Sequence, residues 1–139
     1  MKDESGKYYF TEDERLTVFD KIISAFELFY EDGDYYYDAQ VVEEACTSAL
    51  QICANRKDAR KATAYAEKAA YCAIMFDTYD PTERHTSLLM RDMSAGDHYQ
   101  EEHNRSYNLL ELLRNEKFGF LSGCESFDRI LHELKIAAK

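Results

Sequence analysis

The chain has 139 residues and carries 17 Lys and Arg side chains against 27 Asp and Glu, so its formal net charge is −10. An apolar fraction of 45% and an aromatic fraction of 14% are too high for a disordered chain, and the length suits one domain. The acidity argues against direct nucleic-acid binding, no apolar run is long enough for a membrane helix, and the polar start lacks a secretory signal.

The first expected element is a helix that starts near Thr11. The run Thr11-Glu12-Asp13-Glu14 has the form of a capping box, with acidic residues in the first turn. One apolar stripe follows at helical spacing, formed by Leu16, Phe19, Ile22, Ile23, Phe26, Phe29 and Tyr30. Gly33 suits the left-handed position that ends such a helix.

Residues 34–77 are expected to form a helical hairpin at the core of the domain. One helix would run from Asp34 or Asp38 to Asn55, and the next would be capped by Asp58 and end near Asp77. Eleven of the 15 alanines lie between positions 39 and 73, and small residues let two helices approach closely. The short turn between the helices makes them antiparallel.

The segment 82–103 shows the least regular pattern. Leu88, Leu89 and Met90 form a short apolar run there, and we expect them to be buried. A turn is expected at 94–97 because Gly96 lies among small and polar residues.

Two more helices are expected after this segment. They span about Asn104–Asn115 and Glu125–Ala137, with a tight turn at Phe118–Leu121 between them. No stretch alternates apolar and polar residues as a half-buried strand would. The sequence therefore predicts one all-α domain over residues 1–139, with about five to six helices arranged as antiparallel hairpins.

Charge is unevenly distributed along the chain. Residues 1–44 carry 13 acidic and 4 basic side chains (net −9), residues 45–75 carry 2 and 5 (net +3), and residues 76–139 carry 12 and 8 (net −4). The acidic first third and the basic middle could be complementary surfaces, within one chain or between chains. A solvated surface of mixed charge is the alternative.

The four cysteines show no Cys-x-x-Cys pair. Cys46, Cys53 and Cys72 lie in the apolar register of their helices, which favours small core residues in a reducing cytoplasm. Cys124 is expected at a helix start, where the helix N-terminus could lower a thiol pKa, although packing against Phe127 explains the position as well.

Two histidines resemble a zinc-protease motif only loosely. His98 and His103 are five residues apart, and five helical steps turn the rings about 140° away from each other. Neither a phosphate-binding glycine loop nor an activated nucleophile is evident. We expect no enzyme activity, no cofactor and no metal.

Part of the hairpin matches the spacing of a tetratricopeptide repeat. Ala62, Ala66 and Ala69 fit its second helix, and Cys46, Ala49, Leu50 and Cys53 fit its first. Tetratricopeptide domains that bind peptides use the first-helix face, and this implies a partner-binding surface at Glu44, Thr47, Gln51 and Asn55.

Tyrosines cluster in the acidic first third. Tyr8, Tyr9 and Tyr35–Tyr37 could form an aromatic interface, or they could be half-buried in ordinary helix packing. Tyr36 is the member included among the candidate partner-binding residues.

A resemblance covers almost the whole chain. The segments that carry it are Tyr9–Leu16, Tyr65–Ala70, Phe76-Asp77, Pro81, Thr86–Met90, Leu109–Leu113, Phe118–Leu121 and Phe127–Ile130. In this order they resemble the C-terminal region of a group of Firmicutes helix-turn-helix transcriptional regulators. In that group a lambda-repressor-like DNA-binding domain precedes a tetratricopeptide-like helical domain.

The resemblance implies a cytoplasmic, non-enzymatic module that controls DNA binding by forming a homodimer or by binding a protein or peptide. The 139 residues hold no counterpart of the DNA-binding domain, so we expect this chain itself to contact no nucleic acid and no membrane. A stand-alone acidic helical adaptor is the alternative interpretation.

Overall fold

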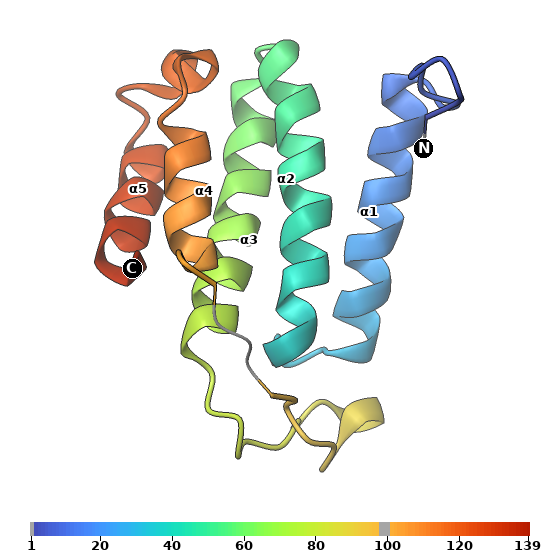
Figure 1. Cartoon of the computed structure of the whole chain (residues 1–139), viewed down its shortest axis with the longest axis vertical. Helices are drawn as coiled ribbons and strands as arrows, with labels where there is room; N and C mark the ends of the chain where they lie inside the picture. The colour runs from blue at the N-terminus through green and yellow to red at the C-terminus, as the bar shows by residue number, and fades with distance from the viewer. Residues whose placement is uncertain (1, 98–100) are drawn as a thin grey trace.

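The computed structural model describes residues 2–97 and 101–139, and every regular element within them is helical (Figure 1). The α-helices are α1 (Glu12–Phe29), α2 (Ala39–Asn55), α3 (Ala59–Thr78), α4 (Arg105–Leu113) and α5 (Glu125–Ala137). Short 3-10 helices lie between them: η1 (Tyr36–Asp38), η2 (Leu88–Met90) and η3 (Glu116–Leu121). The predicted all-α class is confirmed.

Successive α-helices run in opposite directions, side by side along the molecule (Figure 1). The contact between α2 and α3 is the most extensive, α1 packs on α2, and α4 and α5 both pack on α3. The predicted hairpin therefore lies at the centre of the domain. The long connection from α3 to α4 passes below the turn that joins α1 to α2 (Figure 1).

Side-chain caps lie at three of the predicted helix starts, and the caps at Thr11 and Asp58 were themselves predicted. Thr11 and Glu14 form a reciprocal capping box, in which each side chain accepts a backbone N–H of the other at 3.2 Å. Asp58 caps α3 by accepting the N–H of Lys61. Asn104 caps α4 in the same way. These caps satisfy backbone donors that have no partner inside their helix.

Two helix boundaries refine the prediction. The second helix begins at Ala39, which agrees with the predicted start at Asp38 and not with the one at Asp34, because η1 precedes it and Tyr36 has a positive φ of 48°. Asp38 makes no side-chain cap and accepts the hydroxyl of Tyr30 instead. The fourth helix ends at Leu113, and the expected turn around Phe118 is the 3-10 helix η3.

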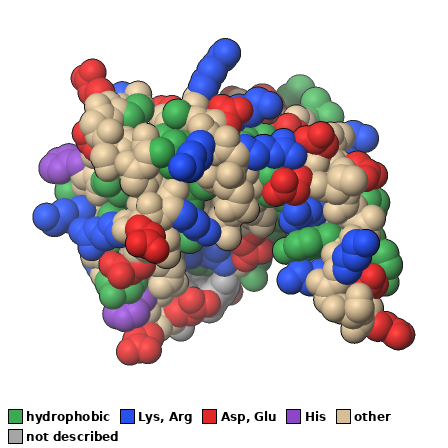
Figure 2. Space-filling model, turned by 90° about the horizontal axis from the view of Figure 1, so that it is seen from above, with side chains coloured by type: hydrophobic (Ala, Val, Ile, Leu, Met, Phe, Trp, Pro, Cys, Tyr) green, Lys and Arg blue, Asp and Glu red, His purple; other side chains and the backbone are tan. Residues whose placement is uncertain are grey.

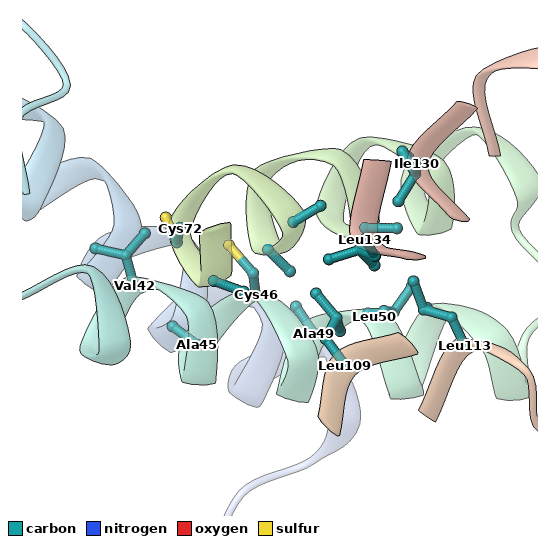
Figure 3. Close-up of a cluster of buried hydrophobic side chains, with 14 of the residues drawn as sticks. Val42, Ala45, Cys46, Ala49, Leu50, Cys72, Leu109, Leu113, Ile130 and Leu134 are labelled. Carbon is teal, nitrogen blue, oxygen red and sulfur yellow. The ribbon is translucent and has the colours of Figure 1, made fainter. Parts of the chain in front are cut away.

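Small side chains on α2 and α3 build the centre of the core. Ala49, Ala62, Ala66 and Ala69 are fully buried, as the close approach of the two helices requires. Helices α4 and α5 form a second hairpin. It adds larger side chains to this core, namely Leu109, Leu113, Ile130 and Leu134 (Figure 3). Each buried leucine or isoleucine contributes about 2 kcal/mol relative to an exposed one.

The acidic helix α1 meets the basic middle of the chain through ion pairs and a hydrogen bond. Arg56 pairs with Asp13 at 2.8 Å, Lys68 pairs with Glu27 at 3.2 Å, and the Tyr65 hydroxyl donates to Asp20. The charge complementarity noted in the sequence thus operates within one chain. Only Phe19 and Ile23 of α1 are buried, so this helix is the most lightly packed of the long helices.

A buried ion pair fixes the second hairpin on the first. Glu43 of α2 is 6% exposed, and its carboxylate accepts from the Arg105 guanidinium at 2.6 Å. Arg105 also donates to Gln40 and to Glu44. Asp77, at the end of α3, accepts the backbone N–H groups of Arg105 and Ser106. The start of α4 is therefore tied to both helices of the central hairpin.

Arg105→Ala is expected to destabilise the fold by about 3 kcal/mol, because it leaves a buried carboxylate without its partner. Urea unfolding at pH 8 measures this. Arg129→Ala is the matched control, since it breaks an exposed pair with Glu67 that contributes less than about 1 kcal/mol. Equal losses in the two variants would show that the Arg105 pair does not hold α4 in place.

The same pair should make stability depend on pH. Burial raises the pKa of Glu43 to about 7, against the lowering effect of Arg105. The folded state then binds more protons than the unfolded state between pH 4.5 and about 7, so stability falls as pH rises through that range. In Glu43→Gln this slope should flatten in urea titrations. An unchanged slope would assign the pH dependence to other groups.

Candidate protein-interaction site

Asp34, just after the turn that follows α1, is the centre of a buried polar network. It is 7% exposed, and its carboxylate accepts the Ser87 hydroxyl and the Thr86 backbone N–H, the latter at 2.7 Å. Burial alone would raise the pKa of Asp34, but these hydrogen bonds lower it below the ordinary value. The carboxylate is therefore stabilised in its charged form.

Further hydrogen bonds join the same two segments. The Ser87 hydroxyl accepts the backbone N–H of Asp32 at 3.0 Å, and Thr86 donates its hydroxyl to the Asp32 carboxylate at 2.8 Å. The backbone N–H of Leu88 donates to the Glu31 carboxylate. We call these contacts of residues 31–34 with 86–88 the Asp34 clasp.

His85 lies beside the clasp within an aromatic cluster. Its ring centroid is 4.9 Å from those of Tyr30 and Tyr36, and it is 5% exposed. Its Nδ1 atom is 3.3 Å from an Asp34 oxygen, within ion-pair distance, but the geometry is not that of a hydrogen bond.

The arrangement of Ser87, His85 and Asp34 does not match that of a hydrolase triad. A nucleophilic serine must donate to its base, whereas Ser87 donates to Asp34 and is fully buried. The network is therefore suited to hold a loop in position rather than to perform chemistry.

The clasp holds two adjacent leucines in solvent. Leu88 is 78% exposed and Leu89 is 64% exposed, so the prediction that they are buried is wrong. Hydrogen bonds of residues 86–88 to residues 31–34 hold their backbone against the α1–α2 turn, and the two side chains project into solvent. Met90 is the only one of the three that packs partly against the core.

The C-terminal end of α1 adds more exposed apolar surface nearby. Leu28 is 75% exposed and Phe29 is 43% exposed, and both lie in the last turn of α1, which η2 contacts. We call Leu28, Phe29, Leu88 and Leu89 the leucine tip; η2, drawn in gold at the lower right of Figure 1, lies below the end of α1. Grouped apolar side chains of this kind are typical of protein-binding surfaces.

A shallow open groove of about 410 Å³ runs along α1 and reaches the leucine tip at Leu28. Its lining residues are Thr17, Asp20, Lys21, Ser24, Ala25 and Leu28. Seen from above, the right-hand part of the molecule, which holds α1, is separated by a hollow from the helices to its left (Figure 2).

The predicted partner-binding residues fall into two groups. Glu44, Thr47, Gln51 and Asn55 share one face of α2, but Glu44 contacts Arg105 at 3.3 Å and Gln51 contacts Lys117 at 3.4 Å. Neighbouring elements of the same chain therefore occupy part of this face. Tyr36 is remote from Asn55, at the other end of α2, where its ring packs on Tyr79 and His85.

The tyrosines do not form one surface. Tyr8 and Tyr9 are exposed at the N-terminus, but Tyr35 is 1% exposed, which agrees with the alternative of helix packing and not with an aromatic interface. Tyr35 is buried because its ring packs against Tyr30 and its hydroxyl accepts from Lys68 at 2.7 Å.

The cysteines follow their predicted packing. Cys46, Cys53 and Cys72 are buried, and burial raises the pKa of each thiol, which opposes reactivity. Cys124 precedes α5 and is half-buried. Of the two histidines weighed for zinc, His98 lies outside the described residues, and His103 stacks on Tyr107. No group of three or more potential metal ligands occurs within residues 2–97 and 101–139.

Comparison with known proteins gave no relative: no family model, curated protein or solved structure matches the chain. Among the described helices, none has the length and apolar content to cross a membrane.

Asp34→Ala should release the clasp, because it leaves the buried Ser87 hydroxyl and the Thr86 N–H without an acceptor. We expect a loss of about 3 kcal/mol in unfolding free energy and faster hydrogen exchange at the backbone amides of residues 86–88. Glu83→Ala, in the same connection but exposed, is the control. Unchanged exchange at those amides would contradict the role given to Asp34.

Proposed function

We propose that the chain is a non-enzymatic protein-binding module of a helix-turn-helix transcriptional regulator, with a tetratricopeptide-like arrangement of its hairpins. One observation carries the binding role: a buried polar clasp holds Leu88 and Leu89 exposed. Exposing two leucines does not help the fold, because burying each would contribute about 2 kcal/mol. A partner that covers them provides the reason for their position.

The partner is a protein or a peptide, or a second copy that makes a homodimer. The face of α2 with Glu44, Thr47, Gln51 and Asn55, and Tyr36 beside the clasp, stay as candidate partner contacts. The resemblance to regulators supports the link to transcription, and the net charge of −10 supports a chain that leaves DNA contact to another domain. The unpaired cysteine thiols of the described chain support a cytoplasmic location.

A stand-alone acidic adaptor is the second candidate. It shares the binding role but has no part in DNA binding, and the acidic surface favours it as well. The two candidate functions differ in whether the module acts together with a DNA-binding domain. Only the regulator requires a DNA-binding domain, either encoded in frame upstream or present in the partner.

The double variant Leu88→Ser, Leu89→Ser should lose the cellular partner without losing stability. The test is crosslinking and immunoprecipitation of an epitope-tagged chain expressed from its own gene. Ile136→Ser is the matched control, because Ile136 is also 73% exposed but lies at the end of α5. We expect at least a tenfold loss of captured partner for the double variant only.

Equal capture by the wild-type chain, the double variant and the control would contradict the binding role of the leucines. A captured partner without a DNA-binding domain, together with no such domain encoded in frame, would replace the regulator by the adaptor.

A further inference from the structure

We propose that the leucine tip binds a cationic amphipathic segment of another protein. Apolar side chains of that segment would cover Leu28, Phe29, Leu88 and Leu89, and its Lys or Arg side chains would face the acidic groups around them. This inference rests on the proposed protein-binding function and names the chemistry of the partner.

The leucine tip offers an ordered apolar surface. Leu88 and Leu89 project from a segment anchored by the Asp34 clasp, so their backbone is already ordered before any partner arrives. An ordered site loses less conformational entropy on binding than a flexible loop does. The open groove on α1 ends at Leu28, and the small side chains of Ser24 and Ala25 leave room for a partner helix along it.

Acidic side chains surround the leucine tip. Glu27, Glu31 and Asp32 lie at the end of α1 and in the turn after it. Lys68 pairs with Glu27 at 3.2 Å and also donates to the Tyr35 hydroxyl at 2.7 Å. Residues 81–96, which carry Leu88 and Leu89, add no net charge, because Arg84 and Arg91 balance Glu83 and Asp92. The tip therefore keeps an acidic excess, on a chain whose net charge is already −10.

The same charges argue against a second copy as the occupant. A two-fold contact at the leucine tip would bring the Glu31 and Asp32 carboxylates of both copies to one interface. Two chains with a net charge of −10 also repel each other over distances of several ångströms at physiological salt. A basic segment would instead be attracted by the whole molecule and guided to the acidic edge of the tip.

Two synthetic peptides test the proposal in isothermal titrations. Each has about 18 residues with leucines along one helical face, and the other face carries lysines in one peptide and glutamates in the other. We expect the lysine peptide to bind and the glutamate peptide to bind at least tenfold more weakly. Raising the salt from about 50 to about 300 mM should weaken the lysine peptide severalfold.

Three variants localise the binding. Leu88→Ser, Leu89→Ser should weaken the lysine peptide at least tenfold, and Ile136→Ser should leave it unchanged. Glu27→Gln should weaken it severalfold and reduce its salt dependence, because it removes one charge of the acidic excess. Circular dichroism confirms that each variant is folded.

Equal binding of the lysine peptide to the wild-type chain and the leucine double variant would overturn the proposal, because general acidity would then explain the binding. Tighter binding of the glutamate peptide would overturn it as well. A dimer in sedimentation equilibrium that the double variant abolishes would assign the tip to a second copy.

Results that contradict the cationic partner can be told apart from results that contradict the protein-binding function. If immunoprecipitation captures a partner through Leu88 and Leu89 while the lysine peptide does not bind, the binding function stands and the cationic partner is wrong. If the double variant captures as much partner as the wild-type chain, the binding function itself is wrong.

Discussion

A buried carboxylate in the turn after α1 determines how one end of the molecule is built. The Asp34 carboxylate accepts hydrogen bonds from its local backbone and from Thr86 and Ser87. These two residues lie more than 50 positions further along the chain. A buried carboxylate without such donors would be strongly unfavourable. Residues 86–88 are therefore held in place by charge and hydrogen bonding, and the side chains of Leu88 and Leu89 are left exposed.

The rest of the domain follows a different principle. The α2–α3 hairpin is held by close packing of small side chains, and α4 and α5 cover it with leucine and isoleucine (Figure 3). The Glu43–Arg105 pair gives the second hairpin its register on the first. This apolar core provides the stability that allows the Asp34 clasp to expose Leu88 and Leu89. The apolar core thus stabilises the fold, while the Asp34 clasp holds the exposed leucines in position.

Features that depend on residues close together in the sequence were predicted correctly, and features that depend on contacts between distant segments were not. The starts of α1, α3 and α4 depend on caps within three residues, so Thr11, Asp58 and Asn104 could be recognised directly. The spacing of alanines likewise predicted the hairpin.

The Asp34 clasp depends on contacts between distant segments, and no local pattern around Ser87 indicates them. Leu88 and Leu89 were expected in the core because hydrophobicity alone does not show which way a loop turns. The role of α2 as a partner-binding face stays a prediction, although Arg105 and Lys117 already contact Glu44 and Gln51.

The central claim is that the clasp keeps Leu88 and Leu89 in solvent in the free protein. Methyl NMR with leucine labelling and a soluble paramagnetic relaxation agent measures this directly. The account predicts strong relaxation of the Leu88 and Leu89 methyl groups, comparable with those of exposed Leu28, and little relaxation for the buried Leu109 and Leu134. Methyl groups of Leu88 and Leu89 as protected as those of Leu109 would contradict it.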